Sequence, residues 1–179
     1  MSYMFFGTSA FNQPLTGFDT ALVTTMQGMF LQAAAFNQSL AGFNTSRITS
    51  IISMFDGAAA FDQSLAGFDT SRVTNMGFMF RGAAAFNQPL AGFDTSGVTN
   101  MFSMFKGAAA FDQSLAGFNT SRVTDMRGMF LLASVFNGAG LVVWDTTLVT
   151  DTVGWCKWKV YEIRVETWNH LVSSLEIHV

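Results

Sequence analysis

Apolar residues recur along this chain with a fixed period of 25 residues. A shift of 25 superposes the phenylalanines in three columns, where a column is the set of positions spaced 25 residues apart. These columns, represented by Phe80, Phe86 and Phe93, hold 17 of the 20 phenylalanines, and all 11 methionines fall in the columns of Met76 and Met79. Because no 25-residue unit can bury these side chains alone, the pattern predicts stacked units.

The spacing of apolar residues changes within each unit. In residues 73–83 they recur at intervals of three and four, which predicts a short helix, part of it 3₁₀. Residues 86–90 alternate between apolar and polar, which predicts a short strand, and residues 94–96 predict a turn. The expected fold is an α/β repeat, a solenoid with one short parallel strand and one short helix in each 25-residue coil.

The repeat divides the chain into two parts. Residues 1–155 are expected to form a solenoid of roughly six to seven coils. Residues 156–179 match no repeat, and residues 161–168 alternate as in a strand with one apolar face. Residues 171–179 fit either the second strand of a hairpin or a short helix, so the segment is expected to be a C-terminal cap or a docking segment.

Composition excludes several classes of protein. Only 12% of the residues are charged, half are apolar and the net charge is −3. A disordered chain has few aromatic residues, and a protein that binds nucleic acid or an anionic membrane has a basic patch, so these classes are excluded. No run of 18 apolar residues is present, so no membrane insertion is expected.

One polar column is predicted to lie inside the stack. Its glutamines fall on the same strand face as the phenylalanines and leucines, and a buried amide needs hydrogen bonds. Amide-to-amide bonds from coil to coil would satisfy them. The predicted structural ladder consists of Gln13, Gln38, Gln63, Gln88 and Gln113.

The repeat unit also carries a family resemblance. The string Met-Phe-x-Gly-Ala-x-x-Phe-Asn-Gln-x-Leu-x-x-Phe-Asp-Thr-Ser-x-Val-Thr-Asn-Met recurs through residues 1–155. It resembles the repeat of BspA-like leucine-rich-repeat surface proteins. Members of that family usually have Trp before the Asp, whereas this chain has Phe at that position in every repeat until Trp144. The resemblance implies a leucine-rich-repeat-type solenoid at the cell surface or released from it, acting in adhesion or as structural material. It implies no particular ligand.

The ends of the array suggest self-assembly. A terminal coil without a polar cap exposes its core and an unpaired edge. The predicted first-coil assembly residues are Met4, Phe5, Phe11 and Leu15. The C-terminal segment is predicted to dock on the first coil of another copy, joining copies head to tail. Its predicted contact residues are Tyr161, Ile163, Val165 and Trp168.

Two further surface features are candidates for function. Ile52, Phe78 and Phe102 stand in variable columns and form a candidate lateral apolar patch. Asn37, Asn44 and Asn119 begin Asn-x-Ser sequons, which are candidate N-glycosylation sites in a secreted eukaryotic chain.

The sequence predicts no catalytic residue, metal site or cofactor. Both histidines lie near the chain end, and the single Cys156 has no activating neighbour beyond Lys157. Asp69 and Asp94 alternate in their column with Asn44 and Asn119, which suits a turn-capping role and not acid–base chemistry.

The expected function is that of a non-enzymatic structural solenoid, extracellular or at the cell surface, which forms a homopolymer head to tail. The alternative is an adhesin-type module that binds a surface or matrix protein or a glycan.

Overall fold

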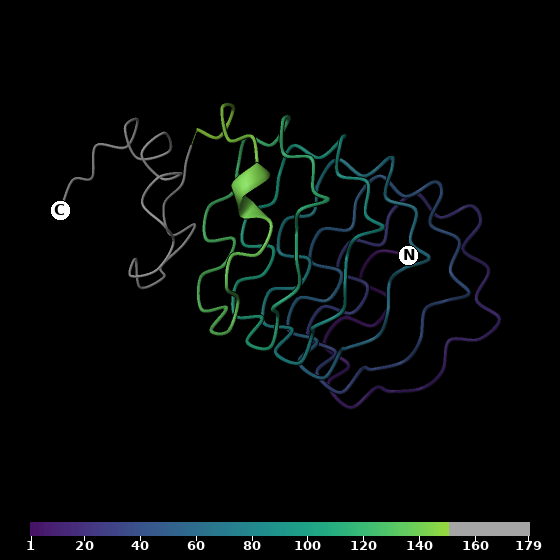
Figure 1. Cartoon of the computed structure of the whole chain (residues 1–179). Coiled ribbons are helices and arrows are strands. Elements are labelled where there is room, and N and C mark those ends of the chain that lie inside the picture. The colour runs from purple at the N-terminus through teal and green to yellow at the C-terminus, as the bar shows by residue number, and fades with distance from the viewer. Residues whose placement is uncertain (151–179) are drawn as a thin grey trace.

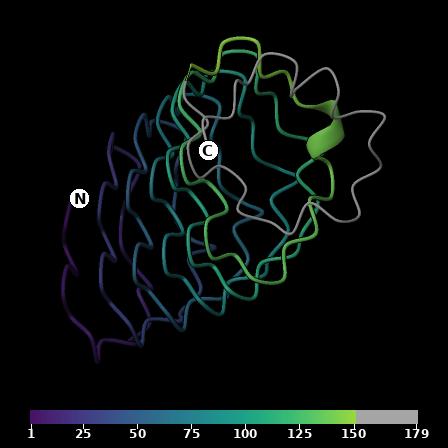
Figure 2. The ribbon, with the colours of Figure 1, turned by 90° about the vertical axis from the view of Figure 1, so that its left-hand side faces the viewer.

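The chain forms a stack of 25-residue coils. A computed structural model describes residues 1–150, and its coils lie side by side from the N-terminal end to η1 (Figure 1). The turned view shows successive coils lying one behind the other (Figure 2). Among the described residues the only helix is the 3₁₀ helix η1, Leu141–Val143, and the only sheet pairing is four isolated parallel bridges.

The predicted helix over residues 73–83 is wrong. The N–H groups of Met76, Phe78, Phe80 and Gly82 donate to carbonyls 24 residues ahead, in the next coil. The N–H groups between them close tight turns, as where Met79 donates to the carbonyl of Met76 at 3.2 Å. Phe78 and Gly82 have φ of 58° and 67°, in the left-handed region, so a right-handed α-helix cannot run through them.

In these consecutive turns the inward-facing residues have the same spacing along the sequence as they would have in a helix. Met76, Met79, Phe80 and Ala83 are all buried. The periodicity therefore identified the inward-facing residues correctly, while the partners of the backbone hydrogen bonds lie in the next coil and not within the segment.

The predicted strand over residues 86–90 is also wrong. The N–H of Asn87 donates at 2.9 Å to Oδ1 of Asp62, a side chain of the preceding coil, where a strand would use a backbone carbonyl. In the other coils the equivalent backbone N–H also donates to the Asn or Asp Oδ1 of the preceding coil, so these side chains take the place of a backbone ladder. Over residues 1–150 the α/β repeat with a strand and a helix in each coil is thus contradicted.

The predicted aromatic interior is confirmed. Within one coil the rings of Phe80 and Phe86 stack at 4.0 Å, and Phe80 stacks on Phe105 of the next coil at 5.6 Å. The rings of Phe80, Phe86 and Phe105 are fully buried. The third column ends with Trp144, whose ring stacks on Phe118 at 6.2 Å. Aromatic contacts of this kind contribute about 0.5–1.5 kcal/mol each beyond burial of their area.

Threonine forms a second inter-coil ladder at the surface. The N–H of Thr124 donates to the carbonyl of Thr99 at 2.9 Å, and that of Thr150 donates to Thr124 at 3.2 Å. This ladder carries the stacking to the last described residue.

Within residues 1–150 the structure contains no helix with the length and apolar character needed to cross a bilayer.

Candidate functional site

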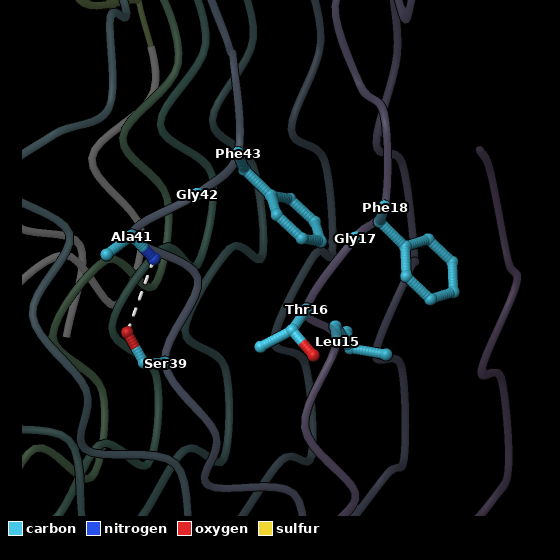
Figure 3. A pocket seen from close by; sticks show the side chains of 8 residues that line it. All are labelled: Leu15, Thr16, Gly17, Phe18, Ser39, Ala41, Gly42 and Phe43. Atoms are coloured by element: carbon cyan, nitrogen blue, oxygen red, sulfur yellow. Dashed lines mark hydrogen bonds between the residues drawn. The ribbon is translucent and has the colours of Figure 1, made fainter.

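A hollow of about 240 Å³ lies at the corner of the first two coils (Figure 3). Its lining consists of Leu15, Thr16, Gly17, Phe18, Ser39, Ala41, Gly42 and Phe43. None of these side chains is an acid, a base or a thiol. Among the described residues there is also no group of three His, Cys, Asp or Glu placed to hold a metal ion.

The carboxylates at the coil corners have lowered pKa values. The Ser71 hydroxyl and then the Ser71 backbone N–H lower the pKa of Asp69, and Ser96 does the same to Asp94. Hydrogen bonds from Thr147 lower the pKa of Asp145, the backbone N–H contributing most. A carboxylate held by such bonds is a weaker base, so these residues cap turns.

Exposed large hydrophobic side chains lie in the first and the last of the described coils. Among the described residues they fall into two groups, with none from residue 23 to residue 131. The first-coil patch consists of Tyr3, Met4, Phe6, Phe18 and Leu22. The last-coil patch consists of Leu132, Val135, Val142, Val143 and Leu148. Scattered exposed apolar residues need no explanation, but a division into two terminal groups does.

The first coil presents half of the contact that joins every pair of coils. Inside the stack the carbonyls of Gln27, Met29 and Leu31 accept N–H groups from the preceding coil. The equivalent carbonyls of the first coil, those of Ser2, Met4 and Phe6, have no donor among the described residues.

The predicted first-coil residues differ in exposure. Met4 is 47% exposed, Phe5 and Phe11 are half-buried, and Leu15 is buried. Phe5 stacks on Phe11 of its own coil at 4.4 Å and on Phe30 of the next coil at 5.4 Å, and among the described residues no ring of a preceding coil packs on it. The four residues therefore share one coil, but only three of them are exposed enough to meet a partner.

The predicted C-terminal contact residues Tyr161, Ile163, Val165 and Trp168 lie outside the described residues. So do both histidines and Cys156.

The glutamine column bonds differently from the prediction. Nε2 of Gln88 donates at 3.0 Å to Oδ1 of Asp62 in the preceding coil, and Gln63 donates in the same way to Asn37. Gln38 and Gln113 make the equivalent bonds, and Gln13 is exposed. Gln-to-Gln bonding is wrong because these side chains are half-buried at the wall, within reach of the Asn/Asp column.

The side wall carries an aromatic and cationic cluster. Phe78 and Phe102 pack edge to face at 4.6 Å, with the Arg81 guanidinium 4.5 Å from the Phe78 ring centre and that of Arg127 4.9 Å from Phe102. Phe78 holds φ at 58°, a strained value for a bulky residue. Of the predicted lateral patch, Phe78 and Phe102 thus touch, and Ile52 is half-buried in the coil before them.

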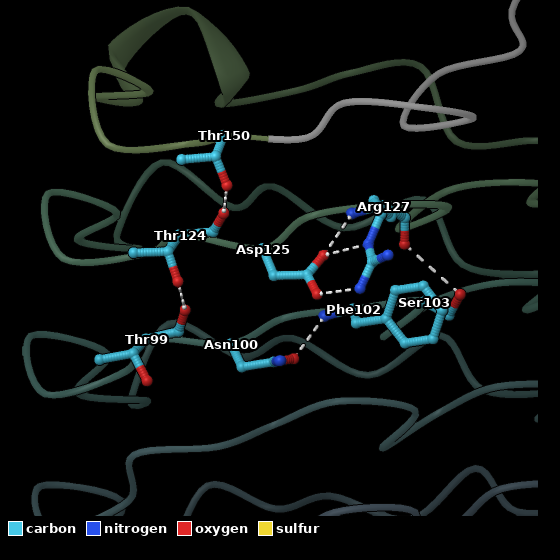
Figure 4. A network of polar contacts seen from close by, with 8 residues as sticks. All are labelled: Thr99, Asn100, Phe102, Ser103, Thr124, Asp125, Arg127 and Thr150. Carbon is cyan, nitrogen blue, oxygen red and sulfur yellow. Dashed lines mark hydrogen bonds and ion pairs between the residues drawn. The ribbon is translucent and has the colours of Figure 1, made fainter.

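Two ion pairs flank these rings. The Arg81 guanidinium donates two hydrogen bonds to the carboxylate of the buried Asp56, the shorter at 2.6 Å. The Arg127 guanidinium likewise donates two to the carboxylate of Asp125, the shorter at 2.7 Å. Figure 4 shows the second pair beside Phe102, between the threonine ladder and Ser103. The Arg127 side chain lowers the pKa of Asp125. Sequence reasoning missed the Asp56–Arg81 pair, although the two residues stand in one column with opposite charge.

The three sequon asparagines have different surroundings. Asn44 and Asn119 are exposed, and each Oδ1 accepts the hydroxyl of the serine two residues on at 2.7 Å. Asn37 is half-buried, and its Oδ1 accepts bonds from the next coil.

Of three comparisons with known proteins, the comparison with family models gives a match. A search of curated proteins and a search of solved structures each find no match. A family model described as "Mycoplasma protein of unknown function, DUF285" matches residues 1–76 and 63–168. Together these matches span residues 1–168, which include all of the described coils, and the chain therefore belongs to this family.

Proposed function

We propose that this chain is a non-enzymatic structural protein of the BspA-like kind, extracellular or at the cell surface, whose copies assemble head to tail. The observation that carries the proposal is the exposed face of the first coil. It presents apolar side chains and carbonyls that, in every inner coil, are covered by the preceding coil.

The geometry of the stack favours an open assembly. Each coil meets its two neighbours through unlike faces, because N–H groups such as that of Phe80 donate to the next coil, whereas those of Thr99 and Asn87 donate to the preceding coil. A contact between unlike faces related by translation does not close on itself, and it extends into a filament. The two ends differ in sequence, so a filament of this kind has a direction.

Purified chain 1–179 tests the proposal. Negative-stain microscopy is expected to show filaments with an axial repeat of roughly 30–40 Å, the height of six to seven coils. Sedimentation velocity is expected to show species that grow with concentration. Monodisperse monomers at every concentration would overturn the assembly.

The cell-surface location has a separate test. Antibodies against the chain are expected to label intact source cells without permeabilisation. Labelling only after permeabilisation would contradict the location and leave the assembly open to its own test.

The side-wall cluster favours a second candidate, an adhesin-type module that binds a surface or matrix protein or a glycan. Aromatic rings and arginines are the residue types that dominate binding hot spots. Phe78→Ser with Phe102→Gly replaces both rings by residues that occur elsewhere in their columns. If the chain is an adhesin, this variant loses binding to a glycan array or to matrix proteins, whereas filament formation stays unchanged.

A further inference from the structure

We infer that the side wall binds an acidic glycan, a sugar chain that carries carboxylate or sulfate groups, through Arg81, Lys106 and Arg127. The inference rests on the second candidate function, the adhesin-type module, and names the chemical class of its ligand. It is independent of head-to-tail assembly, because it uses no residue of the first-coil patch or the last-coil patch.

Cations gather on this wall. Three of the six Lys and Arg side chains of residues 1–150 stand in the columns of Arg81 and Phe102. Lys106 follows Arg81 in its column by one coil, a step at which the stacked rings of other columns lie less than about 6 Å apart. Asp56 and Asp125 pair with the two arginines, whereas no ion pair of Lys106 occurs among the described residues. Like charges on neighbouring rungs repel each other, so a bound anion would stabilise this arrangement.

The guanidinium of Arg81 is fixed in place and yet accessible. Its Nε and Nη2 donate to the Asp56 carboxylate, and its plane lies 4.5 Å from the centre of the Phe78 ring. The side chain remains 44% exposed, and the Nη1 donors are left for a carboxylate or sulfate of a ligand. A donor that is fixed before binding loses less conformational entropy on association.

Arg127 is held in a similar way one column away. Its guanidinium lies between the Asp125 carboxylate and the Phe102 ring, 4.9 Å from the ring centre (Figure 4). The side chain is 45% exposed. The wall therefore presents two guanidinium groups, each positioned by a carboxylate and a ring, with the Lys106 ammonium group in the coil between them.

The Phe78 ring occupies a position that is costly for a phenylalanine. Its column has positive φ in every described coil from the first to the sixth, and it holds a small residue in four of the other coils: Gly28, Ser53, Ser103 and Gly128, with Tyr3 in the first. Folding of the coil is thus compatible with glycine or serine there, whereas a bulky side chain is strained. Strained residues of this kind cluster at binding sites, and this ring positions the Arg81 guanidinium.

The surroundings of the rings favour a sugar over a protein. A protein interface needs an apolar core, but no large hydrophobic side chain of the described structure is exposed from residue 23 to residue 131. A sugar needs less apolar area, because its C–H groups pack on part of an aromatic face while its hydroxyl groups form hydrogen bonds. Oδ1 of Asn100 accepts the N–H of Phe102 at 2.9 Å, which places a half-buried amide beside that ring.

Binding of defined polymers to purified chain 1–179 tests the inference. The probes for biolayer interferometry are a hyaluronan oligosaccharide, which carries carboxylates, and a heparin oligosaccharide, which carries sulfates. Dextran is the neutral sugar control, and polyglutamate is the acidic peptide control. At least one acidic sugar is expected to bind, with an affinity that falls as salt is added. Dextran and polyglutamate are expected to bind at least about tenfold more weakly.

Single cation variants locate the site. Lys106→Gln and Arg127→Gln are each expected to weaken binding of the acidic sugar about tenfold, and glutamine already occupies the column of Arg127 at Gln27. Arg72→Gln is the matched control, because it removes the same charge from an exposed coil corner and is expected to leave binding unchanged. Circular dichroism and thermal unfolding check that each variant is folded.

A double variant removes the third cation without changing the net charge. Asp56→Leu with Arg81→Leu replaces the ion pair by the residue that the same column holds at Leu31 and Leu131. This variant is also expected to weaken binding about tenfold, because the donors of Arg81 are lost while no buried carboxylate is left unpaired.

The opposite outcomes overturn the inference in distinguishable ways. If neither acidic sugar binds but matrix proteins do, the ligand class is wrong and the adhesin candidate stands. If polyglutamate binds as tightly as the sugars, the wall recognises an acidic peptide. If Arg72→Gln weakens binding as much as Lys106→Gln, overall charge and not this site attracts the sugar. If neither sugars nor matrix proteins bind, the adhesin candidate fails together with the inference, and filament formation is decided separately by microscopy.

Discussion

The inner coils and the end coils are built from one repeat, yet their surfaces differ. From residue 23 to residue 131 no large hydrophobic side chain of the described structure is exposed, because neighbouring coils bury the Phe and Met columns and the exposed columns hold small or polar residues such as Ala, Gly, Ser and Arg. At the ends the same columns lose a neighbour or change their side chains, and large apolar groups meet solvent. The comparison teaches that the repeat stabilises a coil only when both neighbours are present, which is the property of a one-dimensional stack.

The largest expected effect comes from removing a ring in an inner coil. Phe80→Ala deletes a fully buried ring stacked on three others and is expected to cost about 3–5 kcal/mol in the free energy of unfolding. Phe5→Ala removes the half-buried ring of the same column and is expected to cost about 1–2 kcal/mol. Urea unfolding at a concentration where the chain is monomeric measures both. Equal costs would mean that the end coil is as well packed as the inner coils.

Backbone conformation gives the next largest effect. Gly82 has φ of 67°, so Gly82→Ala places a side chain in the left-handed region at a cost of about 1–2 kcal/mol. Gly67→Ala is the control, because Gly67 lies outside this region and nothing lies within 4 Å of its added Cβ. The control is expected to stabilise by about 0.4–1 kcal/mol, since alanine restricts the unfolded chain. Thermal unfolding separates the two, and a neutral Gly82→Ala would contradict the turn geometry.

An ion pair of the inner wall is expected to contribute less than a ring. Asp56 is buried but Arg81 is 44% exposed, so solvent weakens their attraction. Asp56→Ala is expected to cost about 1–2 kcal/mol, mainly because the carboxylate hydrogen bonds are lost. Lys106→Ala, one coil beyond Arg81 in the same column, should change the free energy of unfolding by less than about 0.5 kcal/mol. If Lys106→Ala lowered the free energy of unfolding as much as Asp56→Ala does, the Asp56–Arg81 ion pair would not be a specific source of stability.

The smallest effect is a pH dependence at the coil corners. The pKa values of Asp69 and Asp94 lie below the ordinary 3.8, because Ser71 and Ser96 hydrogen-bond to the ionised forms. The stability that they contribute is present above pH 3.8 and is lost as the pH falls through their lowered values. Asn44 and Asn119 cap the same corners without titrating.

Asp69→Asn with Asp94→Asn is therefore expected to flatten the acid limb of the stability curve. Chemical unfolding from about pH 5 down to about pH 2.5 measures the slope. An unchanged slope would show that other carboxylates dominate the acid limb.

Sequence reasoning found the stacking and missed the hydrogen bonds. The columns of Phe80, Phe86 and Met79 identified the buried residues, because a side chain that recurs at a fixed period meets its own equivalent in the next coil. The interval between Met76, Met79 and Phe80 predicts a helix, although consecutive turns place the same residues inward. Two left-handed residues, Phe78 and Gly82, mark the difference, and a phenylalanine gives no signal that its φ is positive.

The candidate site divides in the same way. The exposure of Met4 and its first-coil neighbours followed from the order of the repeats. The last-coil patch was missed, because Leu132 and Val135 differ from their columns by single side chains and look like ordinary variation. The cluster of Phe78, Arg81 and Asp56 was only partly predicted, since its members meet across coils.

The sequence by itself determined the 25-residue period, the aromatic interior and the membership of each column, because these depend only on which side chains must leave water. The tertiary structure decided where each backbone N–H finds its acceptor, since a peptide group can satisfy the same bond within its own turn or with the next coil. It also decided which end residues remain exposed, because exposure depends on the neighbour that covers a side chain and not on the side chain alone.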